Sequence, residues 1–159
     1  MTPCVSIAQT GEFPRLANMY LHGSVDQTQI PALAQWDMLI LSTAWSQQDL
    51  QELRTLNPDI TIFLYVCSYC PHSPPPASDP WQVGVYNYAE ANDLWWYDRS
   101  SRIASDWPGS RMVNITELGY AGPQGNWREF MTQQIEDLIA SRPAADGVFL
   151  PLVEGRGER

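Results

Sequence analysis

The carboxyl groups are the first side chains to consider, because a pair of them can act as general acid and as base or nucleophile in a hydrolytic reaction. Asp98 and Asp106 lie in residues 70–110, a stretch rich in aromatic side chains that we call the aromatic segment. Both are typical turn residues, Asp106 especially because Trp-Pro-Gly follows it. Asp146 begins a predicted strand, so it lies at the wrong end for a site at the carboxyl edge of a sheet. Glu154 lies in an irregular Gly/Arg/Glu tail. We therefore assign no catalytic residue.

Aromatic rings are the second class of candidates, because a flat ring can stack on the face of a sugar. The chain has 7 Trp and 7 Tyr among 159 residues, and packing inside the protein is an equally good explanation for each Trp. We select the aromatic and polar residues near the carboxyl ends of predicted strands or in the aromatic segment. The candidate substrate-binding residues are Tyr20, Tyr65, Trp95, Trp96, Asp98, Trp107 and Asn114.

Cys67 and Cys70 form a C-x-x-C pattern after a predicted strand. Thiol–disulfide catalysis favours a first cysteine at a helix N-terminus, but the proline-rich stretch 71–76 cannot continue as a helix. A zinc site could use both cysteines and His72, yet the sequence offers no second ligand pair at suitable spacing. We interpret the three cysteines of the chain as incidental, and we expect no metal and no cofactor.

The charge balance excludes several classes of function. The chain carries 18 acidic and 9 basic residues, all nine of them Arg, for a net charge of −9. The absence of Lys excludes Schiff-base chemistry on lysine and the P-loop type of phosphate site. An acidic chain without a basic cluster also argues against nucleic acid as a partner.

The same sequence gives little sign of a membrane or an export signal. No apolar run approaches the roughly 20 residues of a membrane-spanning helix, and the first residues lack the basic and apolar regions of a signal peptide. We expect no membrane partner. The location stays unknown, with the cytoplasm as the default.

Continuous apolar runs are the main strand signals, and they are typical of strands buried on both faces of a parallel sheet. Capping signals mark three helices: Asp26 before a short helix, Ser46 with Asp49, and Asn126 with Glu129. Such an alternation with short connections predicts parallel strands joined by crossover helices. The predicted strands are residues 16–21, 38–41, 60–66, 111–116 and 146–150.

Residues 70–110 break this alternation. Six prolines fall between Pro71 and Pro108, in company with four Trp. The length and aromatic content predict a packed loop with a functional role rather than a linker. We find no boundary that would divide the chain into domains.

Five segments, taken in order, resemble a known group of glycoside hydrolases, the hypothetical glycosyl hydrolase family 15 type. These are (β/α)8 barrels similar to the endo-α-1,4-polygalactosaminidase group. The resemblance extends from Phe13 to Leu150 and implies an α/β fold, the N-terminal half of a (β/α)8 TIM-type barrel. It would have about four parallel strands and a long aromatic loop after the third, with residues 111–116 as an accessory strand in that loop. The segments are Pro14–Leu21, Trp36–Leu41, Leu94–Asp98, Trp107–Thr116 and Asp146–Leu150.

The resemblance also implies how the chain is divided and what it lacks. The barrel domain would cover residues 13–153, with an N-terminal extension at 1–12 and an irregular tail at 154–159. In many sugar-cleaving barrels an acidic residue follows the run that corresponds to Asp146–Leu150 and projects into the active-site mouth. Pro151 stands there in this chain and cannot exchange a proton. The chain is then an inactive fragment of an enzyme that acts on a polysaccharide or oligosaccharide.

Two alternatives to this interpretation stay open. One is a non-catalytic carbohydrate-binding α/β module, and the other is an unrelated small α/β protein of the flavodoxin-like type. For the hydrolase fragment and for the carbohydrate-binding module, the expected partner is a carbohydrate. A truncated barrel would leave strand edges and an apolar inner face exposed, and we therefore expect self-association.

Overall fold

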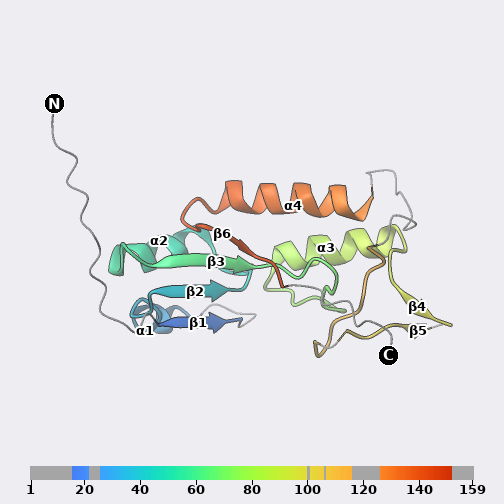
Figure 1. Cartoon of the computed structure of the whole chain (residues 1–159), viewed down its shortest axis with the longest axis horizontal. Helices are drawn as coiled ribbons and strands as arrows, with labels where there is room; N and C mark the ends of the chain where they lie inside the picture. The colour runs from blue at the N-terminus through green and yellow to red at the C-terminus, as the bar shows by residue number, and fades with distance from the viewer. Residues whose placement is uncertain (1–15, 22–25, 100, 106, 116–125, 152–159) are drawn as a thin grey trace, which may run out of the picture.

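The apolar runs of the sequence form one parallel sheet. The computed structural model describes residues 16–21, 26–99, 101–105, 107–115 and 126–151. Neighbouring strands pair in parallel and in the order β1-β2-β3-β6, and Figure 1 shows their arrowheads directed to the same end. The α/β class and the parallel sheet are thereby confirmed. The strands are β1 (Ala17–Tyr20), β2 (Met38–Leu41), β3 (Thr61–Tyr65) and β6 (Gly147–Phe149).

The three predicted helix caps are present. Asp26 accepts a hydrogen bond from the backbone N–H of Thr28, and Ser46 and Asn126 each form a complete capping box. These caps satisfy backbone N–H groups that have no partner inside the helix. The helices are η1 (Gln27–Gln29), α1 (Ile30–Leu33), α2 (Gln47–Leu56), α3 (Pro80–Ala91) and α4 (Trp127–Ser141).

The prediction of a loop over residues 70–110 is wrong in its central part, where α3 spans 12 residues. Asp79 caps this helix by accepting from the N–H of Gln82, and Pro80 occupies the first turn, where a missing N–H costs nothing. Further along the segment, a short antiparallel hairpin is formed by β4 (Tyr97–Asp98) and β5 (Ser101–Arg102). Proline therefore marked a helix start here as well as loop positions.

The strand predicted at 111–116 is also corrected. Its described residues form only isolated bridges, Ala104 with Arg111 and Trp95 with Val113. Residue 116 lies outside the described part of the chain. The segment lies outside the main sheet, where the N–H groups of Arg111, Met112 and Val113 donate to carbonyls of Pro71, Ile103 and Tyr69.

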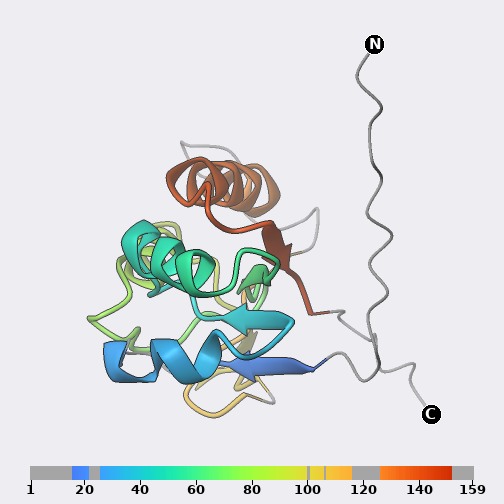
Figure 2. The same cartoon turned by 90° about the vertical axis from the view of Figure 1, so that its left-hand side faces the viewer.

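The helices cover one face of the main sheet. Leu39, Leu41, Ile62 and Leu64 are fully buried in a cluster that includes residues of α1, α2, α3 and α4, and Figure 2 shows these helices on one side of the sheet. The alternate side chains face away from that cluster and are partly or largely exposed. The prediction that the strands are buried on both faces is wrong for this reason. The open face carries Met19, Met38, Ile40, Phe63 and Phe149.

Asp146 links the amino ends of β3 and β6. Its carboxylate accepts a hydrogen bond from the N–H of Ile62 at 2.7 Å and pairs with Arg54 at 2.6 Å. Arg54 also donates to the carbonyl of Ala144 at 2.7 Å. Asp146 thus holds β6 against β3 from the end opposite to the candidate site, which agrees with its interpretation as a structural residue.

Candidate functional site

A cavity opens at the carboxyl ends of the parallel strands, between the sheet and the start of α3. Its volume is about 60 Å³, several times the space that one water molecule needs. Leu21 follows β1, Ser42 follows β2, and Tyr65 ends β3, so each of the first three strands contributes a residue to the wall. This edge is where parallel α/β sheets place their binding sites, because loops from several strands converge there.

Three aromatic rings form a partly exposed stack, and two of them, Tyr65 and Trp107, line the cavity. The ring of Tyr65 stacks on Trp107 with centroids 6.3 Å apart and on Phe149 with centroids 6.2 Å apart. Trp107 is 45% exposed even though it lines the cavity. Burial, followed by the neighbouring Tyr69, raises the pKa of Tyr65. Like other neutral tyrosine hydroxyls, that of Tyr65 can both donate and accept a hydrogen bond.

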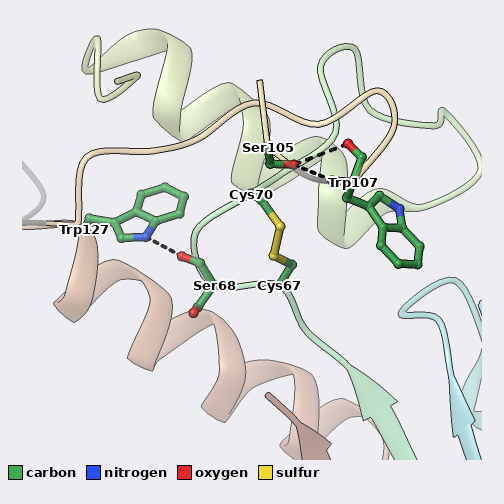
Figure 3. Close-up of a disulfide and its surroundings, with 6 residues drawn as sticks. All are labelled: Cys67, Ser68, Cys70, Ser105, Trp107 and Trp127. Atoms are coloured by element: carbon green, nitrogen blue, oxygen red, sulfur yellow. Dashed lines mark hydrogen bonds between the residues drawn. A yellow bond between two sulfur atoms is a disulfide. The ribbon is translucent and has the colours of Figure 1, made fainter. Parts of the chain in front are cut away.

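A tight turn delivers Trp107 and the buried Ser110 to the same cavity. The N–H of Ser110 donates to the carbonyl of Trp107 at 3.1 Å, Pro108 occupies the second turn position, and Gly109 has φ of +81°. This is the pattern of a type II turn, whose third position requires glycine. The hydroxyl of Ser105 also accepts from the N–H of Trp107 at 3.1 Å, as Figure 3 shows. The local sequence thus positions both side chains.

The hydroxyl of Ser110 is buried and has no hydrogen-bond partner among the described residues. Ser110 is 1% exposed and lines the cavity. A buried hydroxyl without a partner costs about 1–3 kcal/mol, and a polar group that enters the cavity can recover this. Ser42, His72 and Gln82 complete the polar part of the wall. The cavity therefore combines aromatic side chains with several hydrogen-bonding groups.

Asp79 holds the wall on the side of α3. It is fully buried and accepts from the hydroxyl of Thr43 at 2.5 Å and from the N–H of Gln82 at 3.2 Å. The carboxylate thus links Thr43, which lies two residues after the end of β2, to the first turn of α3. Trp81 and Gln82, which both line the cavity, lie in that first turn.

Cys67 and Cys70 form a disulfide in the wall, with Cα atoms 5.6 Å apart. The interpretation of these cysteines as incidental is therefore corrected. The carbonyl of Ser68, inside the disulfide turn, accepts from the indole N–H of Trp127 at 2.7 Å, as Figure 3 shows. The C-x-x-C spacing alone could not reveal the bond, because the sharp turn that brings the two Cα atoms together depends on these distant partners.

Two of the seven predicted site residues meet at the cavity, namely Tyr65 and Trp107. Tyr20 instead packs edge-on against Trp45, with centroids 6.1 Å apart. Trp95 is only 3% exposed and lies under the guanidinium of Arg102, at 4.6 Å from the ring centroid. Its position fits the packing interpretation given for the Trp residues.

The other three lie away from the cavity. Trp96 is 41% exposed, and Asp98 is exposed in β4. The backbone N–H of Asn114 donates to the carbonyl of Leu94. None of these three lines the cavity. Sequence reasoning missed Ser42, Trp81, Gln82 and Ser110, although the Trp-Pro-Gly-Ser turn signal was available for the last.

Hydrolysis of a glycosidic bond would need two carboxyl groups at the cavity. Within the described ranges, the residues that line the cavity include neither Asp nor Glu. Asp106 and Glu154 lie outside the described residues. Pro151 follows the end of β6 by two residues and is partly exposed. The described wall therefore offers groups for binding a neutral polar molecule and no acid–base pair.

The strongest carboxylate interaction in the aromatic segment is structural. Arg102 forms two hydrogen bonds with Glu90, at 2.5 and 2.8 Å. The bond from Arg102 lowers the pKa of Glu90, and the same bond raises the pKa of Arg102. A bidentate pair of this kind fixes geometry. It ties α3 to β5 rather than serving as a catalytic pair.

The described residues give two further negative results. They contain no group of three or more metal-ligating side chains that could hold an ion. Within the same part of the chain, no helix has the length and apolar character needed to cross a lipid bilayer. Comparison of the sequence with protein-family models and with curated proteins finds no match.

Proposed function

We propose that this chain is a carbohydrate-binding α/β domain that binds a sugar unit at the mouth of the cavity, at the carboxyl edge of the sheet, without cleaving it. The observation that carries the proposal is the exposed Trp107–Tyr65–Phe149 stack beside a buried, unpartnered hydroxyl, that of Ser110. A sugar ring has an apolar face of C–H groups and a rim of hydroxyls. The apolar face of the sugar matches the aromatic stack, and its hydroxyls match the hydrogen-bonding side chains of the cavity.

The division of roles follows from the chemistry of the wall. The exposed face of Trp107 would stack on the sugar ring, and burial of a Trp face provides a large apolar contact. Ser42, Gln82 and Ser110 would exchange hydrogen bonds with hydroxyls of the sugar. Because these groups are neutral, the site favours a neutral or weakly charged sugar and does not depend on ion pairing.

The architecture supports a relation to barrel-type glycoside hydrolases. The strands lie in sequence order with the helices on one face, which is the arrangement in one half of a (β/α)8 barrel. A flavodoxin-like sheet has the order 2-1-3-4-5 and helices on both faces, so that alternative fits less well. We propose that the sheet is such a half-barrel and that the open face corresponds to the interior of the barrel.

Binding is tested with a panel of α- and β-linked oligosaccharides of galactosamine, galactose and glucose, by titration calorimetry. For the ligand that binds, Trp107→Ala should raise Kd about 5- to 30-fold, the usual effect of removing a central aromatic contact, about 1–2 kcal/mol. Trp96→Ala is the matched control, since Trp96 is exposed to a similar degree but lies outside the cavity. Equal losses for both variants, or no binding to any member of the panel, would refute the proposal.

The same panel separates binding from hydrolysis. The chain should release no reducing ends at an enzyme-like rate, because the described wall lacks the two carboxyl groups that the reaction needs. Turnover that disappears in Asp98→Asn or Glu154→Gln would show that an acid was misplaced. It would favour the hydrolase alternative over a binding module.

A further inference from the structure

The disulfide between Cys67 and Cys70 is part of the cavity wall, and both of its sulfur-bearing residues line the space. Cys67 is partly exposed, whereas Cys70 is buried. We propose that this disulfide is a reversible redox site whose reduction loosens the wall and weakens ligand binding. The effect on ligand rests on the proposed sugar-binding function, but the redox step and the loosening do not.

The turn closed by the disulfide is a junction between three parts of the chain. The carbonyl of Ser68 accepts from the indole N–H of Trp127 on α4 at 2.7 Å, and the carbonyl of Tyr69 accepts from the N–H of Val113 at 2.9 Å. Directly after the turn, the carbonyl of Pro71 accepts from the N–H of Arg111 at 3.1 Å. These bonds require the carbonyls to keep fixed directions, and the disulfide holds both ends of the turn.

The same contacts lead to the binding groups of the cavity. The N–H of Ser73 donates to the carbonyl of Gly109, and His72 forms a bridge with Ser110. The turn that carries Trp107 and Ser110 is therefore docked on the segment that leaves Cys70. If the disulfide opens, this segment gains freedom, and the two principal binding groups lose their fixed position.

Reduction should leave the rest of the fold intact. Neither cysteine belongs to the hydrophobic cluster that joins the sheet to the helices. The closed loop contains only the residues from Cys67 to Cys70, and the stabilisation that a disulfide gives by restricting the unfolded chain grows with loop length. A short loop of this kind contributes little to global stability. Its opening therefore acts on the wall without unfolding the domain.

The redox step is an ordinary thiol–disulfide exchange with a dithiol reductant. One reductant thiolate attacks Sγ of Cys67, the Sγ–Sγ bond breaks, and Cys70 leaves as a thiolate that takes up a proton. The second reductant thiolate then attacks the reductant sulfur of the mixed disulfide. Cys67 is released and protonated, and the reductant leaves as a cyclic disulfide. Two electrons and two protons pass to the protein.

The site is better suited to being reduced than to catalysing disulfide exchange in other proteins. Cys67 follows β3, and α3 begins only at Pro80, ten residues beyond Cys70, so neither cysteine lies in the first turn of a described helix. A helix dipole at the first cysteine is what lowers the thiol pKa in thioredoxin-like catalysts. The role of the Cys67–Cys70 pair is therefore regulatory.

The first experiment tests the redox step and the loosening without any sugar. A thiol titration of the unfolded chain should give one thiol after oxidation and three after treatment with dithiothreitol, since the chain has 3 Cys. Hydrogen exchange should then show the amides of Arg111 and Val113 exchanging at least tenfold faster in the reduced protein. The amide of Ile62 in the sheet serves as the internal control and should not change. Three thiols after oxidation, or unchanged protection of Arg111 and Val113, would overturn the inference.

The second experiment tests the effect on ligand. The Kd for the best oligosaccharide of the panel should rise at least fivefold on reduction of the wild-type chain. In Cys67→Ser/Cys70→Ser it should be raised already and insensitive to dithiothreitol. If the oxidised protein binds no sugar, the proposed function fails while the exchange result still decides the redox inference. If sugar binds equally well in both redox states, the regulatory part of the inference is refuted and the proposed function stands.

Discussion

Replacement of Asp79 by Ala should destabilise the protein more than loss of an ordinary helix cap. Asp79 is fully buried and accepts from both the Thr43 hydroxyl and the N–H of Gln82. Loss of the cap costs about 1 kcal/mol, and a buried Thr43 hydroxyl left without an acceptor costs about 1–3 kcal/mol more. The expected loss is about 2–4 kcal/mol, which for a domain of this size lowers Tm by about 4–16 °C.

Two control variants separate these contributions in thermal and urea unfolding. Asn126→Ala removes a capping box at the start of α4 that lies nearer the surface, so it should cost only about 1 kcal/mol. Asp79→Asn keeps a side-chain oxygen that accepts from the N–H of Gln82. Its amide NH2 group can donate to the oxygen of the Thr43 hydroxyl, which can accept. This variant should cost less than half as much as Asp79→Ala. The reasoning is refuted if Asp79→Ala is no more destabilising than Asn126→Ala.

Two predictions concern the open sheet face and the ion pair of the aromatic segment. The apolar open face should drive self-association of the wild-type protein. Light scattering should show a smaller mass for Met19→Glu, whereas Leu56→Glu on α2 should leave the mass unchanged. A monomeric wild type would contradict this prediction. Hydrogen bonding from Arg102 lowers the pKa of Glu90, so the pair stabilises the fold fully above the unfolded pKa of about 4.3 and progressively less as pH falls through the lowered folded value. The Tm difference between wild type and Glu90→Gln should therefore be constant from about pH 6 to 8 and shrink below about pH 4; a difference that grows on acidification would show that the pair is not stabilising.

Local signals in the sequence were enough to predict most of the sheet and three of the helix starts. Ser46 with Asp49 and Asn126 with Glu129 form capping boxes because the two residues of each box are only three positions apart. The parallel pairing also followed, since short connections containing helices leave little other choice. The helix at 80–91 was missed because its proline and aromatic content was interpreted as a loop, although Asp79-Pro80 is itself a helix-start signal.

The character of the site depended on contacts between distant residues. Trp107 and Tyr65 are far apart in the chain, and nothing in either local sequence states that their rings will stack. The sequence by itself determined that a turn presents Trp107 and Ser110, because Pro108 and Gly109 set its backbone angles. Only the tertiary structure decided that this turn docks beside a disulfide at the end of β3, since docking depends on hydrogen bonds to residues 69–73. For the same reason Trp95 became a buried packing residue, while Trp107 stayed exposed at the cavity.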